Sequence, residues 1–118
     1  MINVNVRSQG STKIVAIEGE VDLYSSPQVR DTLLEVVQQQ PPAVVVDLRG
    51  VSYMDSSGLA TLIEALQMIE QHSGRLLLAD IRPEVREVFE LSRLDSVFRI
   101  YDSVEQALQS VNSHGTGL

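Results

Sequence analysis

The chain has 118 residues, of which 43% are hydrophobic and 21% charged, as is typical of one compact domain with a single core. Its net charge of −7 and its one lysine, Lys13, disfavour binding to nucleic acid or to an anionic membrane surface. It has no cysteine, no apolar segment approaching about 20 residues and no secretory signal at its start, so we expect a soluble, cytoplasmic protein without disulfides.

Two alternating segments open the chain. Apolar and polar residues alternate over residues 2–7, and a second alternation follows a Ser-Gln-Gly-Ser turn, which predicts a β-hairpin over the first 22 residues. In the second strand, one face carries three apolar residues and the other three acids: Val15, Ile17 and Val21 against Glu18, Glu20 and Asp22. The acidic face is expected to be solvated or functional, rather than a cation cage.

A helix is expected next, between Ser25-Ser26-Pro27 and Pro41. Serine can cap free amides at a helix start, and proline is tolerated in the first turn. The buried stripe of this helix would consist of Val29, Leu33, Val36 and Val37. Residues 43–48 (AVVVDL) then form an almost unbroken apolar run, which is typical of a central strand covered on both faces of a parallel sheet.

Strands and helices continue to alternate in the second half of the chain. A helix should begin at the Asp-Ser-Ser cluster of residues 55–57; a strand over residues 75–79 should lead to a helix opened by Pro83, with Val85, Val88 and Phe89 facing inward. A last strand over residues 97–101 should precede a helix whose Asp102 and Glu105 have the spacing of a capping box.

This order of elements predicts an α/β fold, with a mostly parallel mixed sheet, an N-terminal antiparallel hairpin and about four helices. The predicted domain covers residues 1–112. Residues 113–118 belong to a polar, glycine-containing segment and are predicted to form a flexible tail.

Residues 54–59 (MDSSGL) are the strongest candidate for a functional site, because they lie where a strand gives way to a helix. A purely structural role explains the same residue types, since Asp and Ser are preferred at helix N-caps and Gly allows close approach of the backbone. Both interpretations stay open at this point.

Catalysis by this cluster is disfavoured. A serine nucleophile needs a base, and His72 lies near the far end of the same helix, about 24 Å away, while His114 lies in the predicted tail. The flanking residues do not match Gly-x-Ser-x-Gly, and the chain has neither metal-ligand spacing nor a phosphate-binding glycine loop. We therefore predict no catalytic residue, no metal site and no cofactor, but a serine that another enzyme could modify.

Four segments, in order and spacing, resemble the anti-sigma factor antagonists of the STAS family. They are residues 19–22 (GEVD), 44–48 (VVVDL), 54–59 (MDSSGL) and 91–94 (LSRL), the last shortly before Val97-Phe98. The resemblance extends from about Asn3 to Val111.

The resemblance implies a binding switch and not an enzyme. Such proteins bind an anti-sigma factor that is also a serine kinase, phosphorylation of the first serine after the aspartate releases it, and a metal-dependent serine phosphatase resets the switch. That serine is Ser56 here, and ATP with its metal ion would belong to the partner. The same match implies partner-binding roles for Asp22, Asp55, Ser57, Gly58 and Leu59.

The chain departs from the family pattern at Arg93, where the family usually has a glycine in a left-handed, helix-closing turn, so some local stability should be lost there. Two other functions remain open. One is a cytoplasmic STAS accessory subunit of a membrane lipid or anion transporter, which would need no phosphate acceptor. The other is a scaffold within a large signalling assembly.

Overall fold

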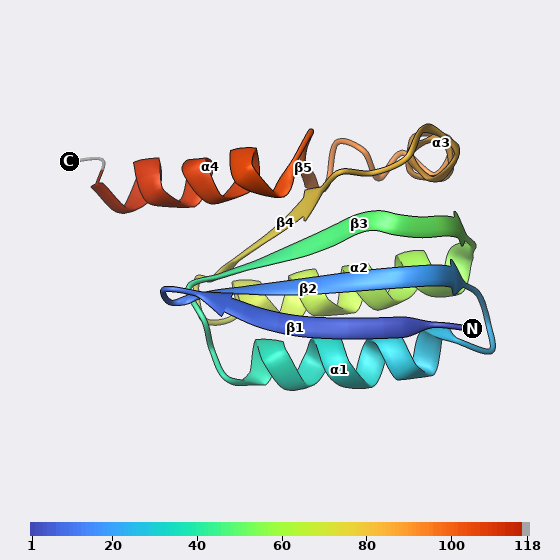
Figure 1. The fold of residues 1–118 in the computed structure, drawn as a ribbon, viewed down its shortest axis with the longest axis horizontal. Coiled ribbons are helices and arrows are strands. Elements are labelled where there is room, and N and C mark those ends of the chain that lie inside the picture. Colours follow the sequence, from blue (N-terminus) through green and yellow to red (C-terminus); the bar gives the residue numbers. More distant parts are fainter. Residues whose placement is uncertain (117–118) are drawn as a thin grey trace.

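A computed structural model describes the backbone of residues 1–116 and the side chains of residues 1–112. One five-stranded sheet has the order β1-β2-β3-β4-β5. β1 (Asn3–Gln9) pairs antiparallel with β2 (Thr12–Val21), and β2, β3 (Ala43–Met54), β4 (Arg75–Ala79) and β5 (Arg99–Tyr101) run parallel (Figure 1). The predicted α/β fold with an N-terminal hairpin is confirmed.

Four helices cover this sheet, as predicted. α1 (Ser26–Gln38) and α2 (Ser56–Glu70) lie side by side on one face, and α4 (Val104–Thr116) covers the opposite face over β3, β4 and β5 (Figure 1). α3 (Pro83–Leu91) packs near the end of β3. No helix within residues 1–116 is both long and apolar enough to cross a bilayer.

The core consists of two apolar clusters. The larger one joins α1 and α2 to the sheet and includes Val85 and Phe89 of α3; the Phe89 ring meets the Phe98 ring edge to face, with centroids 5.7 Å apart. The smaller one, under α4, is formed by Ile14, Val45, Leu77, Ala79 and Ala107. The apolar residues predicted to be buried in α1 and β2 all lie in the larger cluster, namely Val29, Leu33, Val36, Val37, Val15, Ile17 and Val21.

Two strands of the parallel sheet, β3 and β5, differ from the prediction in length. β3 continues past the apolar run to Met54, because residues 50–54 pair with residues 18–21 of β2 beyond the point where β4 ends. β5 begins only at Arg99, because Val97 and Phe98 belong to a turn in which both amides donate to the carbonyl of Leu94. The edge strand β5 is therefore shorter than predicted, and β3 is longer.

The start of α4 corrects the predicted capping box. Ser103 Oγ accepts the amide of Gln106 at 3.1 Å, and Gln106 Oε1 accepts the amide of Asp102 at 3.3 Å, so Ser103 and Gln106 act where Asp102 and Glu105 were expected. α4 is described as far as Thr116, beyond the predicted domain end at residue 112. The predicted tail, 113–118, includes residues 117 and 118, which lie outside the described residues.

Candidate functional site

The junction of β3 and α2 has the geometry of a capped helix start. Asp55 has extended backbone angles at the N-cap, and its Oδ1 accepts the amide of Ser57 at 2.9 Å as well as the hydroxyl of Ser57. The Asp55 carbonyl accepts the amides of Gly58 and Leu59 at 3.1 and 3.2 Å. Asp55 therefore starts α2 at Ser56, which realises the structural role expected of an aspartate at this position.

The two serines of the cluster have different surroundings. Ser56 is the first residue of α2 and is exposed, and its hydroxyl has no hydrogen bond to any of the residues that the structure describes. Ser57 is half-buried and donates its hydroxyl to Asp55. Of the two, only Ser56 presents an uncommitted hydroxyl to solvent.

Gly58 and Leu59 lie beneath this surface. A Cβ atom on Gly58 would lie 2.6 Å from Met54 Cγ and 2.9 Å from Val21 Cγ1, closer than such atoms can approach. Leu59 is buried in the larger core cluster. Together these two residues let the first turn of α2 pack directly against the ends of β2 and β3, and so they fix where Ser56 is presented.

A second loop, after β2, is held by its own polar side chains. Asp22 Oδ1 accepts the amides of Tyr24 at 2.9 Å and Ser25 at 3.0 Å, while Ser25 Oγ accepts the amide of Asp22 and donates to the carbonyl of Glu20 at 2.7 Å. The bond from the Ser25 amide is the main reason why the pKa of Asp22 is below its usual value. Ser25 is the N-cap residue of α1, but its side chain bonds within this loop and makes no side-chain cap hydrogen bond, unlike the capping serine expected from the sequence.

The two loops lie next to each other at the carboxyl ends of β2 and β3. Val21 is paired with Met54 across the strands, and the Asp55 amide donates to the Val21 carbonyl at 3.1 Å. Figure 1 shows the chain after β2 and the start of α2 at the same end of the sheet. We call residues 22–25 and 55–57 the paired loops. The structure thus brings together four predicted site residues: Asp22, Asp55, Ser56 and Ser57.

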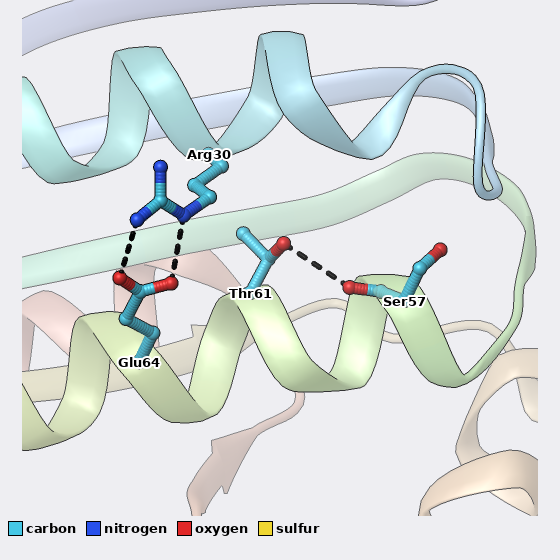
Figure 2. Close-up of polar contacts among 4 residues, drawn as sticks. All are labelled: Arg30, Ser57, Thr61 and Glu64. Atoms are coloured by element: carbon cyan, nitrogen blue, oxygen red, sulfur yellow. Dashed lines mark hydrogen bonds and ion pairs between the residues drawn. The ribbon is translucent and has the colours of Figure 1, made fainter.

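Two further features of this region escaped the sequence analysis. Leu23 and Tyr24, at the tip of the first loop, are 68% and 91% exposed. Arg30 of α1 reaches Glu64 of α2 through two hydrogen bonds, at 2.8 and 2.7 Å (Figure 2). This contact raises the pKa of Arg30 and lowers that of Glu64. Its partners are 34 residues apart, so no local pattern reveals the pair.

Figure 2 also shows Thr61, whose Oγ1 donates to the carbonyl of Ser57 at 3.1 Å. Thr61 and Glu64 follow Ser57 by about one and two turns of α2, so the face of α2 toward α1 is polar near the surface. The Arg30–Glu64 pair joins the middle of α2 to α1, and the Thr61 bond joins the first turn of α2 to its second.

Among the residues whose side chains are described, no metal-binding cluster and no histidine lies at the paired loops. Among the described residues, no group of three or more His, Asp or Glu side chains could hold a metal ion. His72 lies beyond the opposite end of α2, where its Nε2 is 3.2 Å from the carbonyl oxygen of Pro41. The site therefore offers a solvent-facing hydroxyl, two hydrogen-bonded carboxylates and two exposed apolar side chains.

Comparison with known proteins gives the family of the chain. The family model described as the STAS domain matches residues 3–107. The chain is 30% identical over 108 residues to an anti-sigma F factor antagonist of Paenibacillus polymyxa, covering 91% of this chain and 92% of that protein. It is 31% identical over 108 residues to an anti-sigma-B factor antagonist of Bacillus subtilis, covering 92% and 98%.

A solved structure gives the same picture. The crystal structure of an anti-sigma factor antagonist from Mycobacterium paratuberculosis superposes with a TM-score of 0.88 and 28% sequence identity, over 95% of both chains. The matched region covers nearly the whole domain. The chain belongs to the STAS domain family, within which it is similar to the anti-sigma factor antagonists.

Proposed function

We propose that this chain is a phosphorylation-controlled anti-sigma factor antagonist that acts in the cytoplasm by binding and not by catalysis. It binds an anti-sigma factor that is also a serine kinase while Ser56 is unmodified, and phosphorylation of Ser56 releases it. A metal-dependent serine phosphatase restores the binding form. The observation that carries this proposal is the exposed, uncommitted hydroxyl of Ser56 at the start of α2, in a chain similar to anti-sigma factor antagonists.

The surroundings of the two serines support Ser56 over Ser57 as the acceptor. A kinase must align a free hydroxyl with the terminal phosphate of ATP. Ser57 is half-buried and its hydroxyl donates to Asp55, so phosphorylation of Ser57 would require breaking this hydrogen bond. The hydroxyl of Ser56 needs no such rearrangement.

The location of Ser56 also supports release by charge. The free amides at the start of a helix tolerate a phosphate group, so the modified domain would stay folded. The group adds a charge of about −1.5 to −2 next to Asp55 on a chain whose net charge is already −7. A partner that contacts this surface then meets repulsion and the cost of removing water from the phosphate.

The remaining site residues would serve this surface in two ways. Asp22, Asp55 and Ser57 would shape and face the contact, since they form the paired loops around Ser56. Gly58 and Leu59 would affect partner binding through the position of α2, because both are buried. This division predicts that substitutions at the buried pair lower stability and binding together.

Mapping of the phosphate tests the proposal. The chain, its Ser56→Ala variant and the matched Ser57→Ala variant are incubated with ATP, magnesium and the anti-sigma factor kinase encoded in the same genome, and the modified peptide is located by mass spectrometry. We expect phosphate on Ser56 in the unaltered chain and in Ser57→Ala, and none in Ser56→Ala. Phosphate mainly on Ser57, or persisting in Ser56→Ala, contradicts the proposal. An unmodified chain that copurifies with a membrane transporter would favour the accessory-subunit alternative.

A further inference from the structure

The tip of the first paired loop displays apolar side chains to solvent. Leu23 is 68% and Tyr24 is 91% exposed, and Tyr53, 49% exposed, lies on β3 beside Glu20 of β2. Single exposed apolar residues are common on protein surfaces, whereas neighbouring ones next to a functional site mark a contact surface. Leu23 and Tyr24 form such a neighbouring pair, in the loop adjacent to the one that carries Ser56.

Hydrogen bonds hold the loop backbone that carries these two side chains. The carboxylate of Asp22 accepts the amides of Tyr24 and Ser25, the Ser26 amide donates to the Asp22 carbonyl at 2.8 Å, and the Asp55 amide ties the base of the loop to β3. A side chain presented on an ordered loop loses less conformational entropy when a partner covers it. Asp22 therefore stabilises the loop conformation by its hydrogen bonds, and it affects partner binding by positioning Leu23 and Tyr24.

The charge around the loop limits the kind of partner. Glu20 and Asp22 precede Leu23 and Tyr24 of the first loop, and Asp55 lies in the second. The nearest cation along the chain, Arg30, is paired with Glu64. An acidic rim around an apolar tip is complementary to a protein surface with an apolar pocket and basic residues around it. A second copy of this chain, with a net charge of −7, is a poor match for the same rim.

We propose that Leu23 and Tyr24 are the apolar anchor by which the chain docks on the anti-sigma factor kinase, inserted into an apolar pocket that basic residues surround. This inference rests on the proposed function and adds to it the residues that supply affinity. Aromatic and large apolar side chains at the centre of an interface commonly supply most of its binding energy. Ser56 is then the regulator of the contact, and the Leu23–Tyr24 tip is its anchor.

Binding of the purified anti-sigma factor kinase, in the presence of ADP, tests the anchor. Leu23→Ala and Tyr24→Ala should each weaken binding at least tenfold, because each removes buried contact area at the partner. Leu91→Ala is the matched control, because Leu91 is 78% exposed but lies at the end of α3. It should leave affinity unchanged within about twofold. Equal binding by Leu23→Ala and the unaltered chain overturns the inference.

A fluorescence reporter gives a second measurement that does not depend on loss of binding. The chain has no tryptophan, so Tyr24→Trp introduces its only indole. After subtraction of the complex formed by the unaltered chain, the emission of this indole should shift to the blue when the kinase binds. Leu91→Trp should show no shift. An unshifted spectrum of Tyr24→Trp at saturating kinase also overturns the inference.

The experiments separate failure of the anchor from failure of the proposed function. If the unaltered chain binds the kinase and is modified on Ser56, but Leu23→Ala binds equally well, only the anchor is wrong. If the kinase neither binds nor modifies the unaltered chain, the proposed function is wrong and the anchor with it. A homodimer of the chain alone, seen by sedimentation and abolished in Leu23→Ala, would make a second copy the occupant and overturn the inference.

Discussion

Two segments of this molecule expose a leucine to a similar extent in very different surroundings. In the paired loops, Leu23 sits on a loop ordered by the Asp22 carboxylate and lies near the uncommitted hydroxyl of Ser56. In the α3–β5 turn, residues 92–98, the exposed Leu91 precedes a chain reversal made mainly by backbone hydrogen bonds. The comparison teaches that exposure of an apolar side chain does not by itself mark a functional site. A loop ordered by polar side chains and a neighbouring reactive group do.

The turn reverses the chain at a residue with left-handed backbone angles, Arg93. Arg93 has φ of 60°, the Arg93 amide donates to the Glu90 carbonyl at 3.1 Å and the Leu94 amide to the Phe89 carbonyl at 2.8 Å. This is the arrangement in which glycine is usual, and it matches the expectation from the sequence that Arg93 replaces a left-handed glycine. The turn is thus a structural element with a local cost.

The largest expected effect on the unfolding free energy comes from filling the space at Gly58. Gly58→Ala would force a methyl group against Met54 and Val21, and overpacking of this kind costs about 1–3 kcal/mol of unfolding free energy. Chemical denaturation measures it, with the surface change Leu91→Ala as the control, expected within about 0.5 kcal/mol. An unchanged midpoint in Gly58→Ala would mean that the start of α2 is not packed as described.

The cap of α2 should be the next largest contribution. Asp55→Ala removes the acceptor of the Ser57 amide and should lower the unfolding free energy by about 0.5–2 kcal/mol, whereas Asp55→Asn keeps an acceptor and should lose much less. Denaturation of the two variants in parallel distinguishes these results. A loss in Asp55→Asn as large as in Asp55→Ala would show that the charge, and not the cap, stabilises the helix start.

The fold was predictable where hydrophobic pattern decides it. Residues 43–48 and 75–79 are largely apolar runs that helices cover on both faces of the sheet, and both are strands in the structure. The second half of β3 was not predicted, because it has a neighbouring strand only on the β2 side and its polar residues, such as Arg49 and Ser52, interrupt the run. The shift of the α4 cap to Ser103 and Gln106 reflects two adjacent candidate caps that local spacing cannot separate.

The site was predictable in part for a similar reason. The cluster at residues 55–57 carries a local signature of a helix start, and Asp22 follows an alternating strand, so their positions in the chain indicate both loops. No local pattern predicts that Leu23 and Tyr24 are exposed, because leucine and tyrosine are also residue types of protein cores. The Arg30–Glu64 pair depends on the packing of α1 against α2 and appears only in three dimensions.

A substitution in the α3–β5 turn should stabilise the chain, whereas the substitutions described for the paired loops should destabilise it. Arg93→Gly removes the left-handed strain of an exposed side chain and should raise the unfolding free energy by about 0.5–1 kcal/mol. Ser92→Gly, at a residue with φ of −91°, is the matched control and should lower it. Stabilisation by both changes, or by neither, would contradict the role given to the left-handed residue.

The smallest effect is the pH dependence that the Asp22 loop contributes. The pKa of Asp22 is lowered in the folded chain, chiefly by the Ser25 amide, so its contribution to stability is present above its usual pKa of 3.8 and is lost as pH falls through the lowered value. Asp22→Asn should therefore lose less stability than the unaltered chain as pH falls from about 5 to about 2. Urea titrations across this range make the comparison, and parallel curves would contradict it.

The central claim is that the paired loops form a surface controlled by charge at Ser56. Partner affinity before and after phosphorylation tests this claim most directly. Calorimetric titration of the anti-sigma factor kinase should give at least a hundredfold weaker binding for the modified chain, about 2.7 kcal/mol. The ratio should fall as ionic strength rises from about 0.01 to 0.1 M, and amide spectra should change only near the paired loops. Equal affinities, or a ratio independent of salt with spectral changes reaching residues 43–48 of β3, would contradict the account.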